Sequence, residues 1–287
     1  MLRLGGKNKQ ACFVLLSAYA IFVATIIITL THYTMDCFNI FLIIMSAIAA
    51  IVFIALYFVD AGYGMFFNKK WGPSVPSRWG WMMMEAPVFI AMLLLWAFSG
   101  RQHDEVRLAF LLLFLLHYLQ RSFIFPLLIK GNNRMPLVIV LMAIVFNMGN
   151  AAMQGGWLFY VSPAELYPAS WFGSWQFIVG VILFFTGMYI NIDSDRIIRN
   201  LRKPGDSAHY LPRGGMYKYV SSANYFGELV EWTGFAILTW SLPGAVFVWW
   251  TFANLAPRAA RIYNRYEAEF GAEFTNEKRK RILPFIY

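Results

Sequence analysis

Residues 37–59 read CFNIFLIIMSAIAAIVFIALYFV and contain no charged side chain. A helix needs roughly 20 apolar residues to cross the hydrocarbon core of a bilayer, so this stretch is long enough to span one. The whole chain supports the same interpretation, because hydrophobic residues make up 59% of its 287 residues and charged residues only 14%. A soluble domain usually carries about 25% charged residues, so we predict an integral membrane protein.

Seven further stretches share this length and apolar character. Together they predict eight membrane segments, at about residues 11–31, 37–59, 80–99, 108–129, 136–160, 171–192, 220–241 and 243–257. The last two meet at Ser241-Leu242-Pro243-Gly244, a turn signal that predicts a helical hairpin. The expected fold class is therefore all-α, a polytopic transmembrane helix bundle. No G-x-G-x-x-G pattern and no P-loop occurs, so we expect no Rossmann domain.

The 24 Lys and Arg residues are spread unevenly between the two sides of this map. If the N-terminus is cytosolic and the segments alternate, nearly all of them fall on the cytosolic side. This obeys the positive-inside rule and predicts that both chain ends are cytosolic. The membrane would be the plasma (inner) membrane of a bacterium or the endoplasmic reticulum of a eukaryote. The net charge is +9, and the basic residues adjoin apolar runs. We therefore expect them to interact with the anionic headgroups of membrane lipids rather than with nucleic acid.

Four strongly charged residues lie inside the predicted segments: Glu85, Arg121, Glu228 and Glu231. Ionisable groups inside a bilayer are costly and usually face a protein interior or a cavity. Asn224, Glu228 and Glu231 follow the spacing i, i+4, i+7, which places them on one helix face. A polar face of this kind is typical of a buried site, although a Glu–Arg pair can also be purely structural.

Other polar stripes occur in three more segments. They comprise Asn147, Asn150 and Gln154; His117 and Arg121, with Tyr118 between; and Asn191 with Asp195. Amide stripes often serve as interhelical contacts, each worth about 0.6 kcal/mol. Several stripes together favour one polar site that opens to the cytosol, since Glu228, Glu231 and the Asn191–Asp195 pair fall in the cytosolic half of the predicted bundle.

A long loop, expected over residues 193–219, follows the sixth predicted segment, 171–192, and precedes the seventh, 220–241. From Asp195 it reads DRIIRNLRKPGDSAHYLPRGGMYKYVSS. One interpretation is a loop that binds lipid headgroups, and the other is an ordered lid that holds an anionic ligand. The turns Pro204-Gly205 and Pro212-Arg213-Gly214-Gly215 favour the lid. Arginine suits phosphate because its guanidinium group forms bidentate hydrogen bonds.

The same region resembles the steroid 5-alpha-reductase (3-oxo-5-alpha-steroid 4-dehydrogenase) family. The resemblance rests on NIDSDRIIRNLRKPGD, LPRGGMYKYVSSANYFGELVEWTGFAILTWSLP and the terminal ILPFIY, with weaker similarity through LLHYLQRSF and WMMMEAPVF. It covers about residues 80–287. We interpret the chain as a bacterial-type homologue in which residues 1–36 add a tail and an extra helix to a seven-helix core, residues 37–287. The core would include a cytosolic cofactor-lid loop, 193–219, and a cytosolic tail, 258–287.

The resemblance implies a membrane-embedded, NADPH-dependent reductase that reduces the C4–C5 double bond of 3-oxo-Δ4 steroids and binds its cofactor within the helix bundle. By match to the family motifs, Glu85 and Tyr118 would bind the C3 carbonyl oxygen of the substrate. The cofactor contacts would come from Asn191, Asp195, Arg202, His209, Tyr210, Asn224, Glu228, Arg258 and Tyr266. Where family members carry a Tyr in the lid loop, this chain has His209 followed by Tyr210, so the form of that contact stays open. Glu231 matches a family position without an assigned role. We expect no bound metal, and we expect the protein to be a monomer.

The implied chemistry fits these side chains. Hydride added to C5 moves charge onto the C3 oxygen, and donors aimed at that oxygen stabilise it in a dry site. Tyr118 is such a donor, and Glu85 is one in its protonated form, which an apolar site favours. A proton then adds at C4.

Three other functions remain open at this point. The chain could be a related reductase of another lipid double bond, such as a polyprenol or an enoyl thioester. It could be a methyltransferase built on a similar C-terminal hairpin, as in isoprenylcysteine methyltransferases. It could also be a transporter that uses the buried carboxylates, although no inverted repeat is visible.

Overall fold

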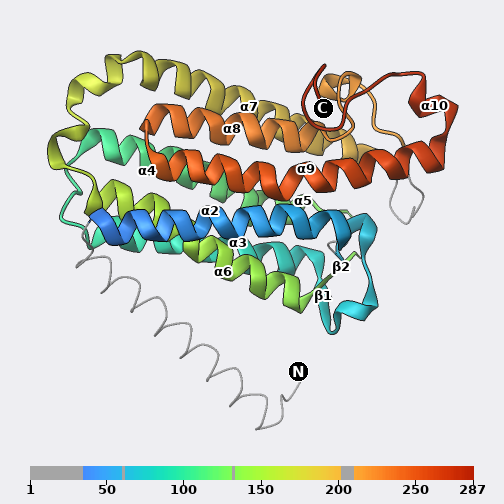
Figure 1. The fold of residues 1–287 in the computed structure, drawn as a ribbon, viewed down its shortest axis with the longest axis horizontal. Coiled ribbons are helices and arrows are strands. Elements are labelled where there is room, and N and C mark those ends of the chain that lie inside the picture. The colour runs from blue at the N-terminus through green and yellow to red at the C-terminus, as the bar shows by residue number, and fades with distance from the viewer. Residues whose placement is uncertain (1–34, 60–61, 131–132, 202–209) are drawn as a thin grey trace, which may run out of the picture.

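The computed structural model describes residues 35–59, 62–130, 133–201 and 210–287. The predicted segment 11–31, and all but the end of the predicted N-terminal unit 1–36, lie outside these residues. Figure 1 shows the long helices running side by side along the longest axis of the molecule.

Helices account for nearly all of the regular structure in the described ranges. They are α2 (Met35–Phe58), α3 (Ser77–Ala97), α4 (Glu105–Leu119), α5 (Phe125–Leu128), α6 (Leu137–Gly156), α7 (Trp175–Asn200), α8 (Ala223–Thr239), α9 (Leu242–Phe270) and α10 (Ala272–Thr275). Short 3-10 turns lie at Gly64–Phe66, Lys69–Trp71, Ala164–Leu166, Ala169–Gly173 and Gly215–Lys218, and π-helical turns at Gln120–Ile124 and Trp157–Val161.

Five helical stretches are long and apolar enough to cross a membrane. They are α2, α3, Glu105–Leu128, Leu137–Val161 and α7. The remaining two predicted segments form α8 and α9, which pack together as the expected hairpin. At its turn Trp240 has a φ of 44°, and the Ser241 hydroxyl caps α9 by accepting from the Gly244 N–H at 3.2 Å. The prediction of an all-α helix bundle is confirmed.

Two helices extend well past their predicted ends. α7 continues to Asn200, so residues 193–200, predicted as the start of the lid loop, are helical. α9 continues through Pro257 to Phe270, so the segment predicted as a tail from residue 258 begins as a helix. The predicted start of the loop is wrong because charged residues end an apolar stretch without ending a helix, which continues as an amphipathic one. The start of a cytosolic tail at residue 258 stays a prediction.

Glycines bring α7 and α8 into direct backbone contact. A Cβ atom at Gly187 would lie 2.6 Å from the Gly227 carbonyl oxygen, and one at Gly234 would lie 2.7 Å from that of Gly180. Small residues let two helices approach this closely in a membrane protein. The contact fixes the side chains near the end of α7 against those at the start of α8.

A two-stranded ribbon joins the starts of α3 and α6. Its strands, β1 (Ser74–Pro76) and β2 (Arg134–Pro136), are antiparallel, with Val75 opposite Met135. Each strand ends in a proline that directly precedes its helix, a position where the missing N–H costs nothing. The ribbon lies at the end of the bundle that also holds the described C-terminal segment (Figure 1).

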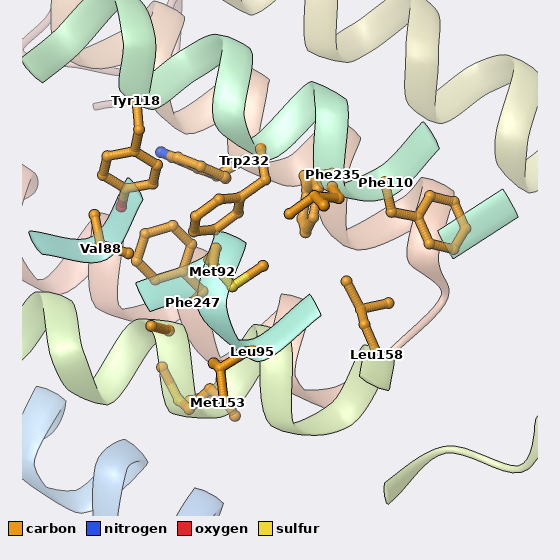
Figure 2. Packing of buried hydrophobic residues seen from close by; sticks show 14 of the residues in the cluster. Val88, Met92, Leu95, Phe110, Tyr118, Met153, Leu158, Trp232, Phe235 and Phe247 are labelled. Carbon is orange, nitrogen blue, oxygen red and sulfur yellow. The ribbon is translucent and has the colours of Figure 1, made fainter. Parts of the chain in front are cut away.

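Aromatic side chains dominate the core, and Trp232 of α8 lies at its centre. Its ring centroid is 4.6 Å from that of Phe247 and 5.6 Å from that of Phe114. Figure 2 shows Trp232 beside Phe247 and Tyr118, which links the packing of the core to the wall of the site described next.

Candidate active site

A cavity of about 980 Å³ lies within the half of the bundle that carries the ribbon and the C-terminal segment. This volume is at the upper end of the roughly 300–1,000 Å³ typical of small-molecule sites. Helices α2, α3, α4, α6, α7, α8 and α9 all contribute to its wall. Apolar and aromatic side chains line much of it, including Trp81, Met84, Phe146, Trp232, Phe247 and Trp250.

Two amides of α6 orient the predicted substrate-binding pair. Asn147 donates from Nδ2 to Glu85 Oε2 at 3.0 Å and to the Met84 carbonyl oxygen at 2.7 Å. Asn150 donates from Nδ2 to the Tyr118 hydroxyl at 3.0 Å. Because Tyr118 accepts this bond, its own hydroxyl hydrogen can point at a ligand. Glu85 and Tyr118 both line the cavity, so the structure brings the predicted pair to one wall.

The helix that carries Tyr118 continues into the π-helical turn Gln120–Ile124. Pro126 follows this turn and has no N–H for the usual helical bond, which favours a local irregularity. π-Helical turns are frequent at functional sites. Here the turn buries the guanidinium group of Arg121, which lies 4.4 Å above the Trp81 ring and 4.7 Å above that of Phe125.

Arg121 is paired with two carboxylates from different helices. Its Nη1 lies 3.4 Å from Asp195 Oδ2 on α7, and its Nη2 lies 3.6 Å from Glu228 Oε2 on α8. Asn224 donates from Nδ2 to the other Asp195 oxygen at 3.1 Å. The cluster carries two anions against one cation, and every member lines the cavity. It can accept hydrogen bonds from ligand hydroxyl or amide groups.

Asn191 lies just behind this cluster. It is 3% exposed, it is not part of the cavity wall, and its Nδ2 donates to the Asn224 backbone carbonyl at 2.9 Å. The structure therefore places Asn191 where it supports Asn224 rather than where it touches a ligand in the cavity.

The part of the cavity wall formed by α9 and by the loop before α8, called the outer part below, holds cationic and hydroxyl groups. The guanidinium group of Arg258, the first residue after the predicted end of the α9 segment, lies 4.3 Å above the Tyr63 ring and 5.6 Å from that of Tyr225. The side chains of Tyr210 and Tyr266 also line the cavity. Arg258, with Arg199 and Lys130 on the same cavity wall, supplies positive charge for an anionic ligand, and the tyrosine hydroxyls supply neutral donors.

The start of α8 adds a further anion-binding element. Ser222 precedes the helix and lines the cavity, and its buried hydroxyl has no hydrogen-bond partner among the described residues. The first N–H groups of a helix have no partner inside the helix, and with the helix dipole they suit phosphate. A dinucleotide with phosphate groups fits this donor set.

Sequence matching proposed eleven site residues, and nine of them are described. Eight line the cavity: Glu85, Tyr118, Asp195, Tyr210, Asn224, Glu228, Arg258 and Tyr266. Asn191 lies behind the wall, and the predicted positions Arg202 and His209 lie outside the described residues.

Sequence reasoning left several cavity residues unassigned. Tyr217 lines the wall and is 1% exposed, and burial holds the pKa of its hydroxyl well above the ordinary value, so this group stays a neutral donor. Arg199, one turn after Asp195, also lines the cavity. The signal for Arg199 was its four-residue spacing from Asp195, which keeps both on one helix face once α7 is known to continue.

The pairing of His117 with Glu231 was also not predicted. His117 Nδ1 lies 2.8 Å from Glu231 Oε1, and both side chains are buried. The spacing offered a signal, because His117 and Arg121 are four apart on one helix while Glu228 and Glu231 are three apart on another. Two basic groups could therefore face two acidic groups across one helix contact.

Comparison with known proteins identifies the family. The sequence profile described as 3-oxo-5-alpha-steroid 4-dehydrogenase matches residues 133–287, which is more than half of the chain. The chain belongs to the 3-oxo-5-alpha-steroid 4-dehydrogenase family. Members of this family are oxidoreductases, so the protein is an enzyme of that class, and its apolar helices make it an integral membrane protein.

Relatives from plants and mammals match over most of their length. Steroid 5-alpha-reductase DET2 of Arabidopsis thaliana is 37% identical over 82% of this chain and 90% of its own. The 3-oxo-5-alpha-steroid 4-dehydrogenase 1 of Bos taurus is 36% identical over 84% and 93%, and that of Homo sapiens is 40% identical over 74% and 81%. The profile match contains the Asp195–Asn224–Glu228 cluster, whereas Glu85 and Tyr118 precede it.

Proposed function

We propose that this protein is an NADPH-dependent reductase that transfers hydride to C5 of a 3-oxo-Δ4 steroid, reducing the C4–C5 double bond to the 5-alpha product. The observation that carries the proposal is one cavity with two chemically different parts. Glu85 and Tyr118 supply hydrogen-bonding groups beside an aromatic wall, and the outer part presents arginines, tyrosines and a helix N-terminus. The first part suits a rigid apolar ketone and the second an anionic dinucleotide.

At the substrate end, Tyr118 and Glu85 would hold the C3 carbonyl oxygen. Asn150 keeps the Tyr118 hydroxyl oriented, and Asn147 does the same for the Glu85 carboxyl group. Donors that are already in place stabilise negative charge on that oxygen without reorganisation, most strongly where water is excluded. Tyr118 and Glu85 would therefore stabilise the negative charge that develops on the C3 oxygen as the enolate forms.

At the cofactor end, the supply of hydride would come from bound NADPH. Asp195, Asn224 and Glu228 present acceptors for amide and hydroxyl groups, while Arg258, Tyr210 and Tyr266 line the outer part, where the phosphates would bind. Arg202 and His209 are proposed as further contacts from the lid loop. For Asn191 we propose a positioning role, because it holds the Asn224 backbone from behind.

The proposed arrangement in the membrane follows the charge distribution. The cavity end carries the basic C-terminal segment and the loop after α7, so the positive-inside rule favours a cytosolic cofactor site and C-terminus. The protein would cross the plasma (inner) membrane in a bacterium or the endoplasmic reticulum in a eukaryote, and would act as a monomer. The unit boundaries proposed are an N-terminal addition, 1–36, and the reductase core, 37–287.

The test uses the full chain purified into lipid nanodiscs. NADPH oxidation is followed with a 3-oxo-Δ4 steroid, with NADH as the alternative cofactor, and with an enoyl thioester or a polyprenol as the alternative substrate. Tyr118→Phe and Glu85→Gln are each expected to lower kcat about 10²–10³-fold, the usual effect of losing one donor to a developing oxyanion.

Matched controls are available at exposed positions. Tyr189→Phe and Glu165→Gln make the same chemical changes at residues that do not line the cavity, so both should keep wild-type rates. Wild-type rates in Tyr118→Phe and Glu85→Gln would contradict the site. Turnover of the thioester or the polyprenol, with no turnover of the steroid, would contradict the substrate class.

A further inference from the structure

The pair formed by His117 and Glu231 has no part in the proposed function so far. His117 belongs to α4 and Glu231 to α8, and their side chains are 5% and 1% exposed. His117 directly precedes Tyr118, and its ring centroid lies 5.0 Å from the Tyr118 ring and 4.5 Å from that of Trp232. The pair is thus packed against the proposed substrate-binding wall.

The two nitrogens of the His117 ring have different surroundings. Nδ1 is bound to Glu231 Oε1 at 2.8 Å. Nε2 has no hydrogen-bond partner among the described residues, and it is not completely sealed from its surroundings. Because His117 lines the cavity, Nε2 is the nitrogen that the cavity can reach. A carboxylate on one ring nitrogen fixes the orientation of the ring and leaves the other nitrogen to exchange a proton.

The proposed reduction consumes one proton in each turnover, at C4 of the steroid. Glu85 and Tyr118 would be engaged with the C3 oxygen, while Asp195 and Glu228 are bound to Arg121. Tyr63, Lys130, Tyr217 and Tyr225 also line the wall, but tyrosine and lysine ordinarily titrate at about pH 10. His117, beside Tyr118, is the histidine among the described residues of the wall, and histidine is the side chain best suited to give up a proton near neutral pH.

Resting on the proposed function, we propose that the His117–Glu231 pair is the proton source for C4 of the substrate. In its loaded state the pair holds two protons, one shared between Nδ1 and Oε1 and one on Nε2. After hydride has added to C5, the C3–C4 π electrons of the substrate enolate form the new C4–H bond with the Nε2 proton. The electrons of the broken N–H bond stay on Nε2, the C3 carbonyl reforms, and water reloads the ring.

The charges around the pair are mixed. Glu228 on α8 and Glu85 on α3 are acidic, Arg121 on α4 is basic, and the Tyr118 hydroxyl is neutral and held by Asn150. The direct contact with Glu231 is the closest of these interactions, and it favours the loaded state. Since the loaded state is the protonated one, the rate should fall as pH rises through the titration of the pair.

The test measures single-turnover reduction in nanodiscs from about pH 6 to about pH 9. The wild-type rate should fall at high pH. His117→Gln should lower the rate about 10²–10⁴-fold and abolish this fall, because the general acid is missing. Glu231→Gln keeps a hydrogen-bonding partner but removes the charge, so its fall should move to lower pH. The exposed His103→Gln is the matched control and should behave as wild type.

Two further readouts separate proton transfer from a structural role. Binding of NADPH, followed by tryptophan fluorescence without substrate, should be unchanged in His117→Gln. In D₂O the wild type should place deuterium on a single face of C4, and His117→Gln should lose this selectivity.

Three results would overturn the inference while leaving the proposed function intact. The first is a wild-type pH profile in His117→Gln, and the second is a wild-type pH profile in Glu231→Gln. The third is that His117→Gln loses NADPH binding as well as rate, which would mean that the pair only holds α4 and α8 together. If the wild type itself reduces no steroid enone, the proposed function fails first.

Discussion

At the scale of single residues, buried polar side chains fasten this molecule at both ends of the bundle. Opposite the cavity, the fully buried Arg107 donates to the carbonyl oxygens of Leu158 at 2.7 Å and Pro163 at 2.6 Å. Its guanidinium group also lies 4.9 Å from the Tyr167 ring. The Tyr167 hydroxyl in turn donates to the Thr239 carbonyl at 2.7 Å and accepts from Trp157 Nε1 at 2.9 Å.

Tyr167 makes a pH-dependent contribution to stability. Burial raises the pKa of its hydroxyl to about 12, so above about pH 10 the unfolded chain releases a proton that the folded protein keeps. The contribution is therefore complete below pH 10 and declines as pH rises towards 12. Tyr167→Phe should cost about 1 kcal/mol near neutral pH. This difference should shrink or reverse by about pH 11 in nanodisc unfolding measurements. A difference independent of pH would contradict the account.

At the scale of elements, the closest helix contact also organises the site. The α7–α8 glycines set the distance at which Asn191 reaches the Asn224 carbonyl and Asn224 reaches Asp195. Glycine side chains carry no hydropathy signal, so the apolar pattern predicted both helices but not their mutual approach.

A methyl group at this contact should disturb both stability and cofactor binding. The Cβ of Gly227→Ala would lie 2.8 Å from the Gly187 carbonyl oxygen and would meet the Asn191 backbone, neither of which can move aside cheaply. Such overpacking typically costs about 1–3 kcal/mol. Thermal unfolding should begin earlier and the Kd for NADPH should rise. Gly173→Ala, with nothing within 4 Å of its Cβ, is the control. Equal behaviour of the two variants would contradict the role of the contact.

The elements were largely predictable from sequence, and their boundaries and pairings were less so. The lengths of the apolar stretches predicted every long helix among the described residues. The spacing of the polar residues predicted that Asn224 and Glu228 lie on one helix face. The extension of α9 to Phe270 was not visible, because the charges at its end are equally compatible with a solvated tail. The His117–Glu231 pair was missed because its partners are far apart in sequence and meet only through tertiary packing.

At the scale of the whole molecule, the C-terminal segment fastens the loop before α8. Lys280 pairs with Val220 in a parallel bridge, and the Lys280 carbonyl oxygen accepts from the Ser221 N–H at 2.8 Å. Arg279 donates to the Pro212 carbonyl oxygen at 2.7 Å. The two segments are far apart in sequence, yet they meet at the cavity end of the bundle (Figure 1). The proposed cofactor region is therefore built from α7, α8, α9 and this clasped loop together.

In the proposed function, one cavity brings a reduced nicotinamide to C5 of a steroid enone. The most direct measurement supplies nanodisc-embedded protein with NADPH carrying deuterium at the transferring C4 position of its nicotinamide, together with a 3-oxo-Δ4 steroid. The product is analysed by mass spectrometry and NMR. We predict a 5-alpha ketone with one deuterium at C5. A product without deuterium at C5 would contradict this prediction. So would a steroid that is recovered unchanged although the protein binds NADPH.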